Sequence, residues 1–138
     1  MTNNLAAYIQ DLTDSWNSYD LERILPYYSE EYEAMDIGQP HVQHGRDAVK
    51  EMLVRYWKAF PDLIFRVEST VVEENRIAIS WYAIGTHQGP IMNVPATGHK
   101  VEVRGISIID VENGLVARGC RIWDLAGMLR HMGLLPEL

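Results

Sequence analysis

A single cysteine, Cys120, is the first scarcity in this 138-residue sequence. One thiol cannot form an intrachain disulfide, and it cannot supply a cysteine-based metal site. Basic residues are also few, since 12 Lys and Arg stand scattered against 19 Asp and Glu. The resulting formal net charge of −7 argues against nucleic acid or an anionic membrane surface as a partner.

Long apolar stretches are missing as well, and no apolar run approaches the length that crosses a bilayer. The N-terminal residues contain no basic segment followed by an apolar run, so we expect no secretory signal and a cytoplasmic location. The sequence has no glycine-rich phosphate loop, no nucleophile elbow and no zinc-protease helix motif. The chemistries that depend on these three motifs are therefore not indicated.

What the chain does contain is typical of one globular domain spanning residues 1–138. Its length allows it to bury about two thirds of its unfolded surface around a single core. Apolar residues make up 47% of the chain and charged residues 22%. The 4 Trp and 7 Tyr outnumber the 2 Phe, and such large aromatics with a polar atom suit a ligand pocket or a core equally well.

Helical periodicity dominates the first half of the sequence. Apolar residues at helical spacing predict an amphipathic helix over about residues 4–18. A second, shorter helix is predicted to start at Asp20, a good N-cap, and to be shortened by Pro26. The clearest helix follows Gly45 and stops at Pro61.

The strand signals follow a period of two. A short strand is predicted between the second and third helices, and its alternation aims Asp36 to the same side as Tyr32. Residues 38–45 carry turn formers without a period and predict a loop. In the second half of the chain Asn113-Gly114 is a strong hairpin signal. The long strands predicted there cover residues 63–72, 77–87, 99–110 and 115–123.

Helices followed by strands, without alternation between them, indicate the α+β class with a largely antiparallel sheet. A curved sheet of this length, closed on one side by the N-terminal helices, would enclose a cone-shaped cavity. Such a concave and mostly apolar hollow is where a small ligand would bind.

Asp124 joins the last predicted strand to a final helical segment and has two readings. As a helix N-cap, its carboxylate would accept from the amide of Ala126 or Gly127 and contribute about 1 kcal/mol. On the strand face of Cys120 and Ile122 it would instead be a carboxylate in an apolar pocket, with a raised pKa suited to general acid–base catalysis. This stretch by itself favours the cap.

Two further residues have the chemistry of a catalytic site. His87 shares a predicted strand face with Trp81, and its ring either bonds a loop carbonyl or serves the site. Arg104 shares a face with Glu102, and the spacing favours an exposed ion pair between them. Placed in the cavity, Arg104 would bind an anionic group or stabilise an oxyanion.

The remaining histidines supply no third ligand with fixed geometry, so we expect no metal site. Trp16, Trp57 and Trp81 are core residues by default. In a fold with a cavity, some of them would line the ligand site instead.

Several short segments, in this order, resemble the SnoaL-like polyketide cyclases, a branch of the nuclear-transport-factor-like α+β cone superfamily. The similarity covers most of the chain from residue 45 to 134. The segments are Ala59-Phe60-Pro61-Asp62, Trp81 with Gly85-Thr86-His87-Gln88-Gly89, Pro95-Ala96-Thr97-Gly98, Trp123-Asp124, and Met128-Leu129-Arg130-His131-Met132-Gly133.

The resemblance implies an open cone with a deep pocket, no metal or organic cofactor, and a homodimer or homotetramer. Family cyclases close a ring by intramolecular aldol condensation, and their acid/base residue is the aspartate after the tryptophan of the last strand. That role maps onto Asp124 and reverses the preference for the cap.

We therefore expect an enzyme acting on a hydrophobic, carbonyl-bearing, polyketide-like small molecule. Asp124 would remove a proton from a carbon flanked by carbonyls and later return it, with His87 and Arg104 stabilising oxyanion charge. The residues expected to shape the pocket are Trp16, Asp36, Trp57 and Trp81.

Two alternatives stay open at this point. Related cones hydrate epoxides or shift double bonds in steroids, and an arrangement of Asp36, Arg104 and Asp124 would favour epoxide opening. The cone could also be a non-catalytic ligand-binding or dimerisation module.

Overall fold

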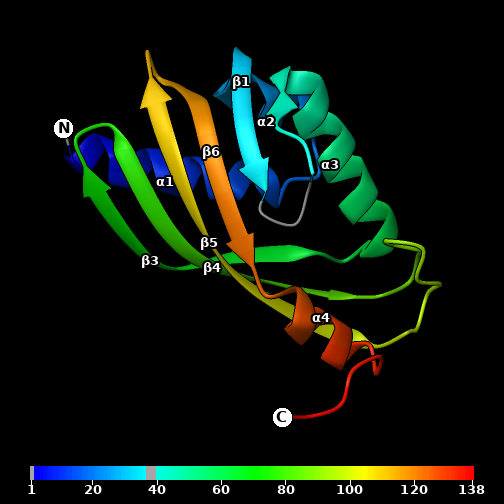
Figure 1. Ribbon diagram of the computed structural model, residues 1–138. Helices are drawn as coiled ribbons and strands as arrows, with labels where there is room; N and C mark the ends of the chain where they lie inside the picture. Colours follow the sequence, from blue (N-terminus) through cyan, green and yellow to red (C-terminus); the bar gives the residue numbers. More distant parts are fainter. Residues whose placement is uncertain (1, 37–39) are drawn as a thin grey trace.

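The computed structural model describes residues 2–36 and 40–138 and has an α+β fold (Figure 1). The helices are α1 (Thr2–Trp16), α2 (Leu21–Ile24), α3 (Gly45–Ala59) and α4 (Leu125–His131), with a 3₁₀ turn η1 (Leu25–Tyr27). The strands are β1 (Tyr28–Asp36), β2 (Gln43–His44), β3 (Ile64–Glu73), β4 (Arg76–Thr86), β5 (Lys100–Glu112) and β6 (Leu115–Trp123). The predicted order of helices and strands is confirmed.

The helix ends follow the predicted signals. The carboxylate of Asp20 accepts from the amide of Glu22 at 3.0 Å and caps α2. Pro26 then stands in η1, where the α-helical hydrogen-bond pattern is lost after one turn. The short α2 is the result, and it brings the chain into β1.

The six strands form one sheet in the order β2-β1-β6-β5-β4-β3. Every neighbouring pair is antiparallel except β1 and β6, which run parallel. Asn113 and Gly114, at φ 53° and 77°, make the tight turn predicted between β5 and β6. The loop predicted over residues 38–45 lies in part outside the described residues, and it is wrong at Gln43 and His44, which pair with the edge of β1.

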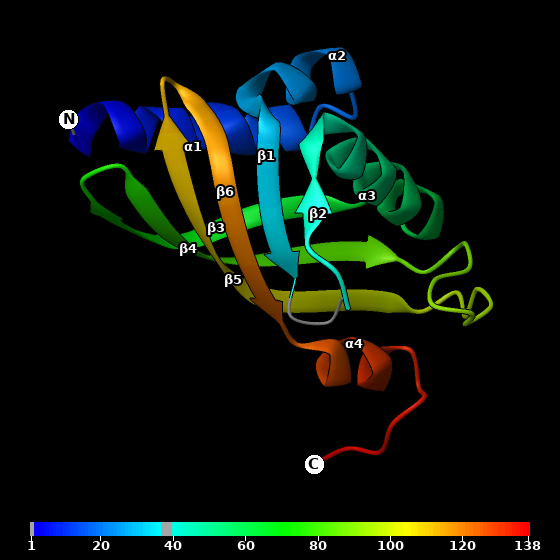
Figure 2. The same cartoon turned by 45° about the horizontal axis from the view of Figure 1, so that its top comes forward.

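The sheet curves, and its concave side is covered by helices. Figures 1 and 2 show α1 lying across one side of the sheet and α3 standing beside β1 and β2. Buried apolar residues of α1, α3, β4 and β5 fill the space between, including Leu12, Leu53, Ile79 and Ile109. Among the described residues no helix is long and apolar enough to cross a membrane.

Within the part of the chain that the structure describes, no helix packs on the opposite, convex side of the sheet, which keeps large apolar side chains in solvent. Val71, Ile106, Ile108 and Ile122 are all exposed there. We call these four residues the convex-face patch. The register places Ile106 opposite Ile122, which makes the patch continuous from β5 to β6.

Candidate functional site

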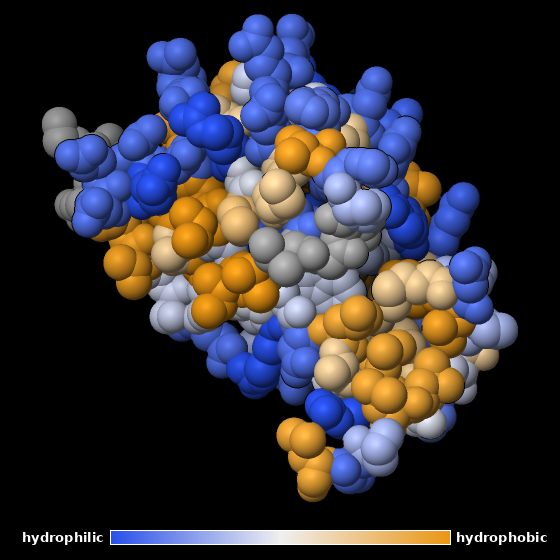
Figure 3. Space-filling view, in the orientation of Figure 1, coloured by the Kyte–Doolittle hydropathy of each residue, from blue (hydrophilic) through white to orange (hydrophobic). Residues whose placement is uncertain are grey.

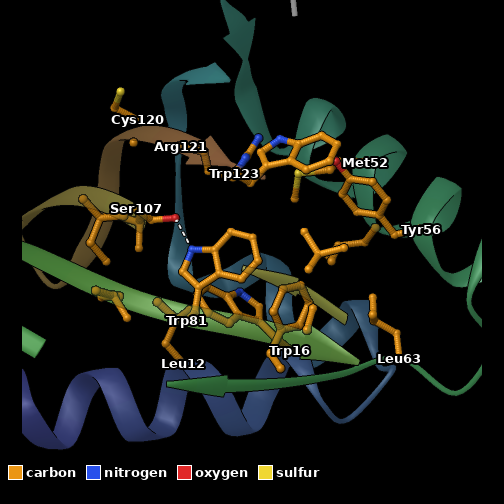
Figure 4. A pocket seen from close by; sticks show the side chains of 18 of the residues that line it. Leu12, Trp16, Met52, Tyr56, Leu63, Trp81, Ser107, Cys120, Arg121 and Trp123 are labelled. Atoms are coloured by element: carbon orange, nitrogen blue, oxygen red, sulfur yellow. Dashed lines mark hydrogen bonds between the residues drawn. The ribbon is translucent and has the colours of Figure 1, made fainter. Parts of the chain in front are cut away.

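A cavity of about 120 Å³ lies between the concave face of the sheet and helices α1 and α3 (Figure 4). Its walls are mainly apolar, and aromatic residues contribute much of them. The tryptophans and tyrosines in the walls are Trp16, Trp81, Trp123, Tyr28, Tyr32 and Tyr56. Walls of this kind are typical of a site for an apolar ring system.

Two of the indole groups are held by hydroxyl groups of the cavity wall. Trp16 donates its Nε1–H to the hydroxyl of Tyr28 at 2.8 Å, and Trp81 donates to the hydroxyl of Ser107 at 2.9 Å. A hydroxyl that accepts from an indole still has its own proton to donate. Tyr28 and Ser107 can therefore offer a hydrogen bond to a bound molecule.

Gly105 allows the indole of Trp81 to lie flat against β5. A Cβ atom at this position would stand 2.4 Å from Cζ2 of Trp81, which is too close for any side chain. The glycine thus sets the depth of the cavity on its sheet side.

One end of the cavity is polar, because Arg121 of β6 enters its wall. Its Nε–H donates to Oδ2 of Asp36 at 3.2 Å, and its Nη2 donates to Oε1 of Gln43 at 3.1 Å. The second oxygen of Asp36 accepts from the indole of Trp123 at 3.0 Å. Asp36 is buried and does not belong to the cavity wall, so the guanidinium is anchored from behind.

The buried charge of Arg121 affects its tyrosine neighbours. Burial raises the pKa of Tyr32 and of Tyr56, and the nearby guanidinium opposes that rise in both. Burial also acts to lower the pKa of Arg121, but Tyr32, Asp36 and Tyr56 outweigh it and raise that pKa. Arg121 is therefore a cation, and both tyrosines are neutral hydroxyl donors, at pH 7.

Asp124 lies at the N-terminus of α4, as the capping reading expects. Its Oδ1 accepts from the amide of Gly127 at 2.8 Å, and its side chain is exposed. The cavity lies on the face of Arg121 and Trp123 rather than on the face of Ile122, which is 57% exposed. Asp124 does not belong to the cavity wall, and its acid/base role stays a prediction.

His87 is buried on the same face as Trp81, as its alternation predicts, but it lies outside the cavity wall. Its Nδ1 accepts from the amide of Thr97 at 3.2 Å and lies 2.9 Å from the hydroxyl of that residue. Its Nε2 has no hydrogen-bond partner within the described part of the chain. The ring therefore holds the loop after β4, and its catalytic role stays a prediction.

Arg104 lies on the convex side of the sheet, in the exposed ion-pair arrangement. It pairs with Glu68 of β3 and stands 3.7 Å from a carboxylate oxygen of Glu102. Asp36 lies on the opposite, concave side of the sheet, next to the cavity. The arrangement of Asp36, Arg104 and Asp124 predicted for epoxide opening is therefore not assembled.

The residues predicted to shape the pocket divide into three groups. Trp16 and Trp81 line the cavity. Trp57 packs on Tyr19, with ring centroids 5.2 Å apart, and is not in the wall. Asp36 is not in the wall, but it accepts hydrogen bonds from Arg121 and Trp123, which are.

Arg121 is the functional candidate that the sequence reasoning missed. Alternation places Trp123, Arg121 and Gly119 on the same face of β6. The charged Arg121 between two uncharged residues of that face was a signal in the sequence. In the described ranges, no group of three or more His, Cys, Asp or Glu residues could hold a metal ion.

Known proteins share this fold. AclR from Streptomyces galilaeus is 27% identical, with 100% of this chain and 86% of AclR covered at a TM-score of 0.87. TsrD from Streptomyces laurentii is 25% identical, with 95% of this chain and 96% of TsrD covered at a TM-score of 0.84. A protein with a ketosteroid isomerase-like fold from Catenulispora acidiphila is 10% identical, with 93% of each chain covered at 0.78.

These likenesses show the fold, an α+β cone of the ketosteroid isomerase-like type, and the predicted fold is confirmed. The sequence model of the SnoaL-like polyketide cyclases matches residues 6–132. The chain belongs to the SnoaL-like polyketide cyclase family. No curated protein matches it significantly.

Proposed function

We propose that this protein is a cyclase- or isomerase-type enzyme that acts on a hydrophobic, carbonyl-bearing small molecule. The observation that carries the proposal is a partly buried cation, Arg121, at one end of an otherwise apolar, aromatic-lined cavity. Apolar walls bind a ring system, and a fixed guanidinium binds an oxygen atom of that ring system. Membership of the family supports the reaction class.

The proposed reaction is an intramolecular aldol ring closure that needs no cofactor. A carboxylate removes a proton from a carbon beside a carbonyl, and the resulting enolate carbon bonds to a second carbonyl carbon. The second carbonyl oxygen takes the proton back, so no atom is gained or lost. The small-molecule substrate is polyketide-like in this proposal, and the cytoplasmic location stays a prediction.

Two carboxylates are candidates for the proton transfer. Asp124 holds the role predicted from the sequence, and its carboxylate must leave the amide of Gly127 to reach a substrate. Asp36 is adjacent to the cavity, but it already accepts from Arg121 and Trp123. The oxyanion roles predicted for His87 and Arg104 have no support from their positions.

Turnover of a panel of polyketide-like β-dicarbonyl compounds tests the proposal, with product mass and labelled water as readouts. Ring closure without incorporation of water oxygen is expected, and incorporation would indicate hydration instead. The control is Ser80→Ala, because Ser80 pairs with Ile106 on the convex side of the sheet and is outside the cavity wall. Loss of turnover in Asp124→Asn, with the rate of Ser80→Ala unchanged, would assign the base to Asp124. A wild-type rate in Asp124→Asn would refute that assignment while leaving the enzyme class intact.

A non-catalytic ligand-binding module is the second candidate, because the Asp124 carboxylate is turned onto a helix amide. Tight binding of the same compounds without any turnover would favour this candidate. Absence of both binding and turnover would remove both functions.

We propose further that the protein forms a homodimer or a homotetramer through the convex-face patch. Figure 3 shows apolar side chains gathered over strands β3 to β6 on this side of the molecule. Contiguous exposed apolar side chains commonly mark an interface. Light scattering should give a mass above that of one chain, and Ile106→Asp should reduce it to the monomer mass. A monomeric wild type would refute the proposal.

A further inference from the structure

The guanidinium of Arg121 is fixed in direction as well as in place. Asp36 and Gln43 hold its Nε and Nη2 atoms at 3.2 and 3.1 Å, and neither anchor belongs to the cavity wall. Arginine has five N–H donors, so two anchoring bonds leave three for other acceptors, and Arg121 itself belongs to the cavity wall. The Arg121–Asp36 pair therefore turns the positive end of its dipole toward a bound molecule.

Two tyrosine hydroxyls accompany this positive end. Tyr32 comes from β1 and Tyr56 from α3, and both belong to the cavity wall with Arg121. Figure 4 shows Tyr56 and Trp123 on the same side of the cavity as Arg121, across from Trp81. The guanidinium opposes the burial-induced rise in the pKa of both tyrosines, in keeping with their place beside Arg121 in the cavity wall.

We propose that Arg121, Tyr32 and Tyr56 form an oxyanion site that binds the substrate carbonyl oxygen and stabilises the negative charge it acquires during enolate formation. Asp36 and Gln43 are positioning residues that hold the guanidinium. The inference rests on the proposed function, since it names which end of the cavity takes the reacting carbonyl.

The charge balance favours a carbonyl over a carboxylate at this site. The Arg121–Asp36 pair has no net charge, so a permanently anionic ligand would leave one uncompensated charge in a buried region. A neutral carbonyl oxygen meets the positive end of a dipole at no such cost. Donors already in place when the charge develops give the largest stabilisation in catalysis.

Infrared spectroscopy of a bound ketone tests the inference without any turnover. The probe is 1-tetralone labelled with ¹³C at its carbonyl, a neutral aromatic ketone whose stretching frequency falls as donors approach its oxygen. We expect the bound frequency in the wild type to lie at or below the value in water. A bound frequency equal to that in a hydrocarbon solvent would overturn the inference.

Variants connect the signal to the named residues. Tyr56→Phe should raise the bound frequency and weaken binding about two- to tenfold, the range for one neutral hydrogen bond. Tyr82→Phe is the matched control, since Tyr82 lies on the convex side and stacks under Arg104. Gln43→Ala should also raise and broaden the band, because the guanidinium loses its uncharged anchor while the charge of the Arg121–Asp36 pair is unchanged. An unchanged frequency in both Tyr56→Phe and Gln43→Ala would overturn the assignment.

Failure of this inference is distinguishable from failure of the proposed function. A ketone that binds with a hydrocarbon-like frequency refutes the oxyanion site and leaves the cavity as a ligand site. A wild type that binds no aromatic ketone at all, measured by calorimetry, refutes both.

Discussion

Two arginine–carboxylate pairs stand on opposite faces of the same sheet and differ mainly in their access to water. In the Arg121–Asp36 pair the side chains are 18% and 2% exposed, and in the Arg104–Glu68 pair they are 57% and 41% exposed. An exposed pair is screened and contributes little, whereas a buried pair becomes costly once either partner is removed. The face of the sheet, rather than the residue type, decides whether an arginine belongs to a site.

Removal of the arginine from each pair should give the largest difference in stability between the two faces. Arg121→Met should lower the free energy of unfolding by about 3–5 kcal/mol, because the carboxylate of Asp36 stays buried without its cation. Arg104→Met should lower it by less than about 1 kcal/mol. Urea denaturation of both variants measures the difference.

A double variant sharpens the same comparison. Arg121→Met with Asp36→Leu should recover most of the lost stability, because no unpaired charge then stays buried. Equal losses in Arg121→Met and Arg104→Met would contradict the contrast between the two faces.

Gly105→Ala examines how closely the concave face is packed. Its Cβ would stand 2.4 Å from Trp81, so we expect a loss of about 1–3 kcal/mol from overpacking and a weaker affinity for aromatic ketones. Gly119→Ala on the neighbouring strand is the comparison for stability alone, because its nearest atom, the hydroxyl of Tyr32, is 3.1 Å away and also belongs to the cavity wall. Calorimetric unfolding of both variants measures stability, and an equal loss in the two would contradict the tight fit at Gly105.

The architecture could be predicted from the sequence because its periodicities are long and unambiguous. The helical repeat before Pro61 and the alternation through β4 and β5 each extend over ten or more residues. Alternation also placed Asp36 with Tyr32 and His87 with Trp81, and both pairs share a buried face. These inferences need only neighbours along one strand.

The site was harder to predict because alternation separates two faces without saying which one is inside. In β6 both faces carry apolar residues, and Ile122 on the exposed face resembles a core residue. The partner of Arg121 is 85 positions away in the sequence, and the contact requires the parallel pairing of β1 with β6. No local pattern contains that pairing.

Substitutions of Asp124, whose carboxylate is exposed, should have a smaller effect on stability. Asp124→Ala should lower the free energy of unfolding by about 1 kcal/mol, because the amide of Gly127 loses its acceptor. Asp124→Asn should change it by only a few tenths, since asparagine caps about as well. Thermal denaturation of both compares them, and a large loss in Asp124→Asn would indicate a buried or paired carboxylate instead.

Asp110 falls between the two extremes, because its carboxylate is 11% exposed while its partners Arg76 and Arg118 are 66% and 53% exposed. Hydrogen bonds from Arg76, at 2.7 Å, and from Arg118, at 3.1 Å, hold the pKa of Asp110 below its ordinary value in spite of partial burial. A folded pKa below the unfolded one means that ionisation stabilises the fold, and that this stability is present above a pH of about 4.

Asp110→Asn should therefore be less stable than the wild type at pH 7, and the deficit should shrink as the pH falls through the folded pKa of Asp110. Water around both arginines screens the attraction, so the deficit should be smaller than the loss in Arg121→Met. Urea denaturation from pH 2.5 to 7 follows it. A deficit that grows in acid would contradict this prediction. It would mean that the folded pKa of Asp110 lies above the unfolded one.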